Sequence, residues 1–381
     1  MHSRFIEKNS FINSYVREEL KSVKMGKIKT LPFISMILPA YNEEAIIERS
    51  MEIITDYLKS KEDKYSWEIL IINDGSSDNT GLLADSLAKI NKNLRVIHHP
   101  VNLNLGRALQ TGFNNAHGDI IVVLDMDLSY SVDHIEKLVD TQVQTNADIV
   151  IASPYMKNGK VTKVPLNREI LSRSLNGFMR LLVREKCHTF TGMVRAYKSE
   201  FIKNLNLKTK DYEINPEILY KAMILRARII EIPAHLDWSF QNGVGKKRAS
   251  GMRIFKSFFS GLMAAFIFKP YVFFLTFGLI LLLLSLYMIT WIFINTFQVL
   301  PTIHPDPQYF DDRFSQAIGY VFQKRPHAFY VGGITLVSAI QVLSLGFLSL
   351  QNKRYFEELF HINTSILKQN RSKALDTDPE K

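Results

Sequence analysis

The chain has 381 residues, a formal net charge of +10 and 46% hydrophobic residues. This length suits one large domain and a smaller additional part. The single cysteine, Cys187, excludes an intrachain disulfide framework. The basic excess is typical of proteins with anionic partners, such as phospholipid, nucleic acid or a phosphorylated substrate.

Residues 1–30 are mixed and polar, and they contain no apolar core of the kind that a signal peptide carries. We expect a flexible N-terminal arm there. The next segment, 31–250, alternates strand and helix patterns and is predicted to be one α/β domain. The predicted strands are 33–39, 67–72, 94–98 and 120–124, with helix patterns between them. Repeated β-α units imply a mostly parallel sheet with helices on both faces.

Polar residues follow three of these strands. They are Pro39–Glu43, Asn73–Gly75 and Asp125–Asp127. Ligands in such sheets bind beyond the carboxyl ends of the strands, where these three clusters converge. Two carboxylates at i and i+2 at a strand end form a compact anionic site for Mg²⁺ or Mn²⁺, which in turn holds phosphates. Taken alone, the D-x-D pattern is more often a solvated loop, and the convergence favours the metal site.

The segments Leu38–Glu44, Ile72–Thr80 and Gly118–Ser129 together resemble family 2 glycosyltransferases of the GT-A fold. Within that family they look like the dolichyl- or polyprenyl-phosphate glycosyltransferases, whose prototype is dolichyl-phosphate mannose synthase. The resemblance covers roughly residues 33–240. It implies a Rossmann-like, mostly parallel sheet with helices on both faces, followed by an interfacial helix and two transmembrane helices.

The resemblance also implies roles on the donor side. Nucleotide-binding positions are Pro39, Ala40, Tyr41, Glu43, Asp74 and Asp125. Asp74 would hydrogen-bond the base, although an Asx turn opening the next loop is an alternative explanation. Asp127 would ligate Mg²⁺ or Mn²⁺ directly, with Asp125 in support. Ser129 occupies the position of a third ligand, where a hydroxyl is a poorer ligand than the residues common in relatives.

On the acceptor side, Arg168, Ser172 and Arg173 match a segment that binds the lipid phosphate in relatives, and all three are predicted to bind the acceptor phosphate. Helix geometry separates them. Arg168 and Ser172 lie four residues apart and therefore on one helix face, whereas the adjacent Arg173 points elsewhere. A guanidinium fork with a hydroxyl suits a phosphate, although a solvated basic face is equally compatible with the pattern. Glu217 matches a glutamate near the acceptor end, so the predicted catalytic residues are Asp125, Asp127, Arg168 and Glu217.

Two further segments complete the predicted site. The stretch 190–195 resembles a T-G-x-x-R element, but Thr189 replaces the acidic residue usual in relatives, which puts a general base there in doubt. An ionised lipid phosphate needs no strong base near pH 7. Lys246, Lys247 and Arg248 follow two glycines and would clamp a phosphate group or, alternatively, contact anionic lipid.

The C-terminal third is predicted to enter a membrane. The uncharged runs 270–295 and 328–351 are long enough to span a bilayer, with buried core helices as the alternative. An aromatic-rich amphipathic helix is expected over 251–269, either interfacial or packed on the domain. Flanking cations place the 296–327 loop outside the cytoplasm by the positive-inside rule, with the catalytic domain and the tail 352–381 inside it.

These features predict an inverting, metal-dependent enzyme that transfers a sugar from a nucleotide-diphosphate sugar, of the GDP-mannose or UDP-hexose type, to polyprenyl or dolichyl phosphate. Alternatives are a glycosyltransferase acting on another membrane lipid and a catalytically inactive nucleotide-sugar-binding membrane protein. A processive polysaccharide synthase is disfavoured because the chain lacks a Q-x-x-R-W element. The cations cluster at the membrane, so no nucleic-acid partner is expected. Small-residue helix faces would suit a homo-oligomer.

Overall fold

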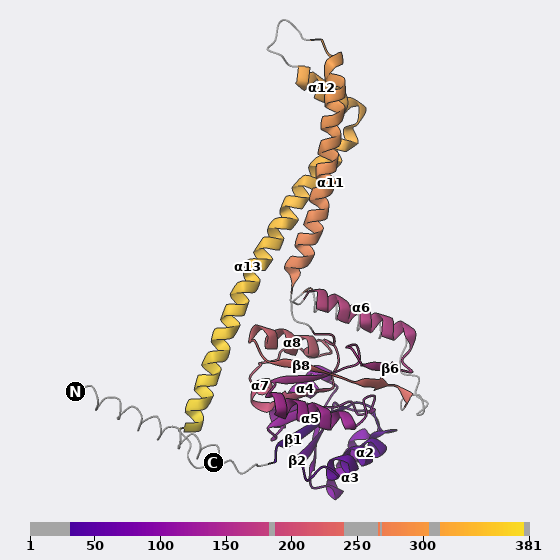
Figure 1. The fold of residues 1–381 in the computed structure, drawn as a ribbon, viewed down its shortest axis with the longest axis vertical. Coiled ribbons are helices and arrows are strands. Elements are labelled where there is room, and N and C mark those ends of the chain that lie inside the picture. Colours follow the sequence, from indigo (N-terminus) through magenta and orange to yellow (C-terminus); the bar gives the residue numbers. More distant parts are fainter. Residues whose placement is uncertain (1–30, 183–186, 240–265, 267–268, 305–312, 377–381) are drawn as a thin grey trace, which may run out of the picture.

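The computed structural model describes residues 31–182, 187–239, 266, 269–304 and 313–376. An α/β domain is followed by two long helices that extend away from it (Figure 1). Seven strands form one sheet in the order β3-β2-β1-β4-β7-β5-β8. These strands are β1 (Phe33–Ala40), β2 (Ser66–Asn73), β3 (Leu94–His98), β4 (Ile120–Val123), β5 (Ile149–Ser153), β7 (Arg195–Lys198) and β8 (Ile229–Pro233).

The sheet is mostly parallel, which confirms the predicted fold class. Strand β1 pairs in parallel with β2 and β4, and β5 pairs in parallel with β8. The exception is β7, which lies antiparallel between β4 and β5. Runs such as Ile69–Ile72 and Ile120–Val123 are buried along their whole length, as expected for parallel strands covered on both faces.

Helices cover both faces and create two apolar cores. One face carries α2 (Ile47–Lys59), α3 (Thr80–Ile90) and α5 (Asp133–Thr145), and the other carries α4 (Leu105–Asn115), α6 (Leu166–Leu182), α7 (Ser199–Lys203) and α8 (Ile214–Ile224). Alternate residues of β1 divide between the cores, with Met36 packing in the first and Ile37 in the second. The sheet is therefore rigidly supported where its carboxyl ends carry polar residues.

A short two-stranded ribbon lies beside the main sheet. Strands β6 (Lys160–Thr162) and β9 (His235–Asp237) pair in parallel, and an isolated bridge joins Leu236 to Tyr130. The ribbon therefore contacts the loop that follows β4, which contains the acidic pair.

The C-terminal helices α11 (Pro270–Val299) and α13 (Pro326–Asp376) pack against each other, with α12 (Arg313–Lys324) beside their far end. The Ser285 hydroxyl donates a 3.0 Å hydrogen bond to the Gly332 carbonyl, and Gly346 meets Leu275 too closely to admit a Cβ atom. Small residues thus allow the close approach that the sequence indicated.

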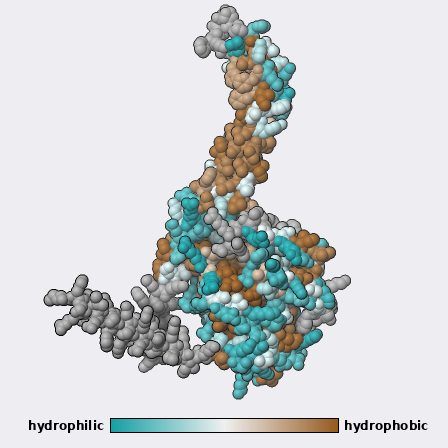
Figure 2. Space-filling model, viewed as in Figure 1, coloured by the Kyte–Doolittle hydropathy of each residue, from teal (hydrophilic) through white to brown (hydrophobic). Residues whose placement is uncertain are grey.

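Both helices are long and apolar enough to cross a membrane. In their most apolar windows only 11% of α11 and 17% of α13 is buried, which contradicts the alternative of two buried core helices. Figure 2 shows the resulting hydrophobic band along the paired helices. Helix α13 does not end at residue 351 but continues to Asp376. The predicted arm over 1–30 and nearly all of the predicted juxtamembrane helix over 251–269 lie outside the described residues.

Candidate active site

The three polar clusters predicted from the sequence meet at one edge of the sheet. Strand β1 lies between β2 and β4, and all three run in the same direction. The register pairs Ala40 with Asn73 and Ile37 with Val123. The loops that follow these strands are consequently neighbours in space, as the convergence argument required.

The first two loops are fastened to each other by hydrogen bonds. Asn42 adopts a positive φ of 57°, its backbone N donates to Ser76 Oγ at 3.0 Å, and its Oδ1 accepts from Ser77 N at 2.8 Å. The Glu43 N donates to Thr80 Oγ1 at 2.7 Å. This network holds the predicted nucleotide-binding segment, with Ala40 buried and the Tyr41 ring 46% exposed.

Asp74 is buried next to that segment. Its Oδ1 accepts hydrogen bonds from His99 Nδ1 at 2.6 Å and from Leu103 N at 3.0 Å. The His99 Nε2 in turn lies 2.9 Å from Thr111 Oγ1. The alternative of an Asx turn at Asp74 is wrong, because Asn73 Oδ1 accepts the turn hydrogen bond from Ser76 N at 3.2 Å. Among the described residues nothing donates to Asp74 Oδ2, so one oxygen is left for a ligand.

The acidic pair directly follows β4. Asp125 and Asp127 are partly exposed, while Met126 between them is buried, so the two carboxylates share the open side of the loop. The Asp127 Oδ1 accepts from Ser129 N at 3.0 Å. Burial and the negative charge of Asp127 raise the pKa of Asp125 well above its usual range.

These two carboxylates fit a divalent cation. The Asp125 carboxylate accepts no hydrogen bond from the described part of the chain, and burial beside the negative charge of Asp127 raises its pKa. Carboxylate oxygens are the ligands that Mg²⁺ and Mn²⁺ prefer. In the same described part no cluster of three or more His, Cys, Asp or Glu side chains forms a complete metal site. The remaining ligands would therefore come from Ser129, water or substrate phosphates.

The Arg168 guanidinium lies near enough to the Asp127 carboxylate for the two charges to interact. Burial lowers the pKa of the Arg168 guanidinium, and the phenol of Tyr212 and the carboxylate of Asp127 act in the opposite direction. Arg168 stands in the first turn of α6. The predicted metal ligand and the predicted phosphate-binding arginine are therefore near enough to interact electrostatically.

The other two members of that predicted acceptor site are engaged within α6 and its surroundings. The Ser172 hydroxyl accepts a 2.8 Å hydrogen bond from Tyr155, and Asn176 contacts it at 3.4 Å. Arg173 forms an ion pair with Glu169 at 2.8 Å and stacks over the Tyr155 ring. The ion pair and the stack engage Arg173 away from the acidic pair, so its role in binding the acceptor phosphate stays a prediction.

Glu217 has the environment of a structural residue. Its carboxylate is buried and accepts from the backbone N of Lys208 and Thr209, from the Thr209 hydroxyl, and from Lys221 Nζ at 2.6 Å. A carboxylate with this many donors is not available to take a proton or contact an acceptor. The geometry therefore assigns Glu217 to holding the 208–209 loop against α8, and its catalytic role stays a prediction without structural support.

Sequence reasoning missed several polar residues beside the site. Buried Asn176 accepts from Phe190 N at 2.7 Å and joins α6 to the element before β7. Glu231 accepts from Thr189 N and from His188 N, each at 2.9 Å, so β8 supplies a carboxylate close to where relatives carry an acidic residue. Neither contact has a signal in the sequence, since the partners lie 14 to 43 residues apart. Lys246, Lys247 and Arg248 lie outside the described residues.

A mostly parallel sheet whose edge carries fastened loops and an open acidic pair is the arrangement of a nucleotide-dependent transferase. Comparison with known proteins identifies the family. The model of glycosyl transferase family 2 matches residues 35–205. The dolichyl-phosphate beta-glucosyltransferase ALG5A of Trichomonas vaginalis is 31% identical over 231 residues, which cover 58% of this chain and 69% of that protein.

A second relative, the polyprenol monophosphomannose synthase of Mycolicibacterium smegmatis, is 30% identical over 192 residues, covering 49% of this chain and 72% of that protein. The chain therefore belongs to glycosyltransferase family 2 and is a glycosyltransferase. Among solved structures, glucosyl-3-phosphoglycerate synthase of Mycobacterium tuberculosis with uridine diphosphate aligns with a TM-score of 0.46 and 20% identity, covering 65% of this chain and 82% of that one. A likeness at this level supports no residue assignment.

Proposed function

We propose that this protein transfers a sugar from a nucleotide-diphosphate sugar to polyprenyl or dolichyl phosphate at the cytoplasmic face of a membrane. The observation that carries the proposal is the meeting of the Asp125–Asp127 pair with Arg168 at the carboxyl edge of the sheet. One group suits the cation and diphosphate of a donor, and the other suits the phosphate of an acceptor. The two relatives named above are, by their names, enzymes of dolichyl phosphate and polyprenol phosphate.

The loops that follow β1, β2 and β4 would bind the nucleotide-sugar donor. Asp74 has one carboxylate oxygen free for a ring N–H of the base, and His99 fixes the other. Asp125 and Asp127 would hold Mg²⁺ or Mn²⁺ with the diphosphate. When bound, that cation supplies positive charge against the negative charge that develops on the leaving nucleoside diphosphate.

At the acceptor end, the Arg168 guanidinium would bind the lipid phosphate and orient one oxygen toward the anomeric carbon of the sugar. The phosphate is ionised near neutral pH, so the attacking oxygen needs no strong general base. A new bond from phosphate oxygen to the anomeric carbon forms as the bond to the diphosphate breaks. A single displacement of this kind inverts the anomeric centre.

The membrane anchor explains how such an acceptor reaches the site. We infer that α11 and α13 cross the bilayer, since each exceeds the roughly 20 residues required. Lys269 precedes the first span, and Lys353 and Arg354 follow the apolar part of the second, which supports a cytoplasmic position for both of these ends. The domain would then stand where the lipid headgroup emerges.

The proposal is tested with the full chain in lipid nanodiscs that contain polyprenyl phosphate. Radiolabelled GDP-mannose, UDP-glucose and UDP-N-acetylglucosamine are supplied in turn, with Mg²⁺, with Mn²⁺ or with a chelator. We expect label in the organic phase with one donor, dependent on the cation and on the acceptor. Label in another lipid when polyprenyl phosphate is omitted would favour the alternative acceptor. A complete lack of labelled lipid with every donor would contradict the proposed function.

A further inference from the structure

Arg168 is stacked on an aromatic ring that the sequence did not connect with it. Its guanidinium carbon lies 4.5 Å from the centroid of the Trp238 ring. A guanidinium lying over an indole face is attracted to the π electrons, and its N–H donors remain directed outward from the edge of the stack. We propose that Trp238 is a positioning residue that holds Arg168 ready for the acceptor phosphate, an inference that rests on the proposed function.

No described residue accepts a hydrogen bond from the side-chain donors of Arg168. In the described part of the chain its guanidinium takes part in no ion pair or side-chain hydrogen bond. Other arginines differ, because Arg95 pairs with Glu68 at 2.8 Å and buried Arg195 donates to the Phe190 carbonyl at 2.7 Å. A carboxylate partner would orient Arg168 but would neutralise it and occupy its fork. An aromatic partner orients the group and leaves both its charge and its donors for a phosphate.

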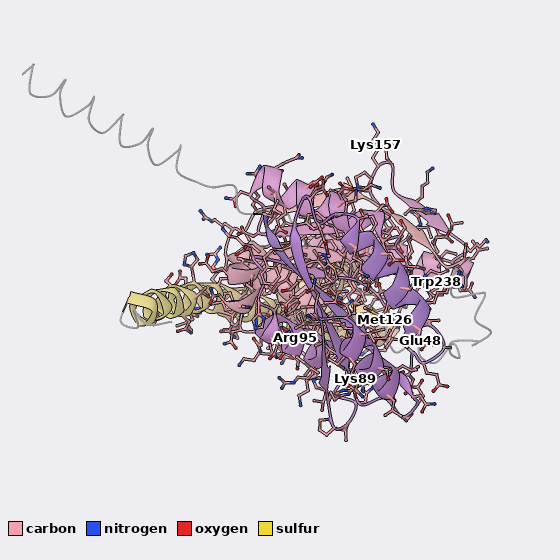
Figure 3. The ribbon with its side chains drawn as sticks, turned by 90° about the horizontal axis from the view of Figure 1, so that it is seen from below. Glu48, Lys89, Arg95, Met126, Lys157 and Trp238 are labelled. Atoms are coloured by element: carbon pink, nitrogen blue, oxygen red, sulfur yellow. The ribbon has the colours of Figure 1, made fainter. Side chains whose placement is uncertain are left out.

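The backbone that carries Trp238 is tied to β6 and, through the preceding residue, to the loop of the acidic pair. The Trp238 N donates to the Thr162 carbonyl at 3.2 Å, and the preceding Asp237 N donates to the Ser129 carbonyl at 2.8 Å. Trp238 and Met126, the central residue of the acidic motif, lie toward the same side of the domain in Figure 3. The two-stranded ribbon of β6 and β9 therefore sets the position of Arg168 relative to Asp127. Through this link the acceptor phosphate and the donor cation would keep a constant separation.

The test compares the wild-type chain with Trp238→Ala, Trp238→Phe, Arg168→Ala and the Trp238→Ala/Arg168→Ala double variant, all as full chains in nanodiscs. We expect Trp238→Ala to raise the KM for polyprenyl phosphate roughly 10-fold, the size typical of a partly desolvated cation–π contact. The KM for the donor should stay within about twofold. Trp238→Phe keeps a π face and should recover most of the acceptor affinity.

The double variant distinguishes a positioning role of Trp238 from a general disturbance of the fold. If Trp238 acts through Arg168, then Trp238→Ala adds no further loss in the Arg168→Ala background. Trp291→Ala is the matched control, because Trp291 forms the comparable stack with Arg325 at 5.5 Å in the C-terminal helices. This control should leave both KM values unchanged. Additive losses, an unchanged acceptor KM, or an equal rise in donor KM for Trp238→Ala would each overturn the proposal.

Binding without turnover distinguishes this inference from the proposed function. The affinity for a short-chain polyprenyl phosphate is measured by thermophoresis in the absence of donor. Wild-type binding that weakens in Trp238→Ala, without transfer from any donor, would support the positioning role and contradict the proposed function. Transfer by the wild type with unaltered binding in Trp238→Ala would contradict the positioning role alone. A wild type that neither binds nor transfers would overturn both.

Discussion

Two acidic regions of this protein contrast in how their charge is balanced. At α8, Glu217 is buried among backbone donors, a hydroxyl and Lys221. At the end of β4, Asp125 and Asp127 share a partly exposed loop, and burial and the negative charge of Asp127 raise the pKa of Asp125. Buried carboxylates are stable when they are paired and costly when they are not. The Glu217 cluster therefore stabilises the fold, whereas the Asp125–Asp127 loop carries negative charge that a bound cation would offset.

The arginines of α6 show the same contrast on a smaller scale. Arg173 is neutralised by Glu169 four residues earlier, whereas Arg168 keeps its donors and is held by a ring. Charge left unpaired by the fold thus separates the residues of the proposed site from those that support it. Among the described residues Asp125 and Arg168 meet this criterion, whereas Glu217 is paired with Lys221 and its catalytic role stays a prediction.

The largest expected effect comes from removing one negative charge of the acidic pair. Asp127→Asn should lower kcat by about 1000-fold, because the cation would lose its direct ligand and the leaving diphosphate its charge compensation. The apparent Tm should stay level or rise, since the repulsion with Asp125 disappears. Turnover is measured by lipid labelling, and Tm by tryptophan fluorescence on the same sample. An Asp127→Asn enzyme with activity within tenfold of wild type would remove the metal role.

The two arginines should differ in their effect on the acceptor. Arg168→Ala should raise the KM for polyprenyl phosphate roughly 30-fold, as expected for loss of a charged hydrogen bond to phosphate. Arg173→Ala removes an exposed ion pair, and the expected change is less than about threefold. Equal effects of the two substitutions would show that net charge on α6, and not the free guanidinium, recruits the lipid.

Much of this organisation could be read from the sequence because it depends on local patterns. The run from Ile120 to Val123 is β-branched and buried, so it marked both β4 and the position of the acidic pair at its end. Periodicity likewise placed Arg168 and Ser172 on one face of α6. What it could not show is which groups approach from elsewhere: His99 reaches Asp74 across 25 residues, and Trp238 lies 70 residues after Arg168.

The features that the sequence did not reveal have equally specific causes. Glu217 was assigned by resemblance, and only the fold shows that donors from 208 to 221 occupy its carboxylate. The four-residue strand β7 is too short to signal its antiparallel insertion between β4 and β5. The predicted span 328–351 follows the apolar run, and α13 continues beyond it to Asp376 because the chain has no proline or glycine from 347 to 376 that would stop a helix.

Substitutions at the Glu217–Lys221 ion pair should lower the stability of the fold and affect catalysis much less. Glu217→Gln leaves Lys221 without its charged partner and should lower the free energy of unfolding by about 2 kcal/mol. The apparent Tm should fall by about 5 °C, and kcat should change by less than about threefold. Exchanging Lys221 for Met in the same variant should recover part of the loss, because no unpaired buried charge then remains. A large loss of kcat at unchanged Tm would restore Glu217 as a catalytic residue.

The smallest expected effect is a pH dependence of the stability that the Glu217–Lys221 pair contributes. Burial raises the pKa of Glu217, but hydrogen bonds from Lys221 and Thr209 outweigh it, and the net pKa is lowered. The folded protein therefore binds this proton less readily than the unfolded chain. The stabilisation is complete above the unfolded pKa of about 4.3 and disappears as pH falls through the folded value. The Tm gap between wild type and Glu217→Gln should narrow from pH 7 to pH 3.5.

Glu48→Gln gives the matched control, since Glu48 is exposed on α2. Its Tm should follow that of the wild type at every pH, because the exposed Glu48 side chain forms no ion pair or hydrogen bond with another described residue. A gap for Glu217→Gln that stayed constant down to pH 3.5 would mean that the packing of Glu217, and not its charge, supports α8. The contrast with the acidic pair would then lie in exposure and not in charge balance.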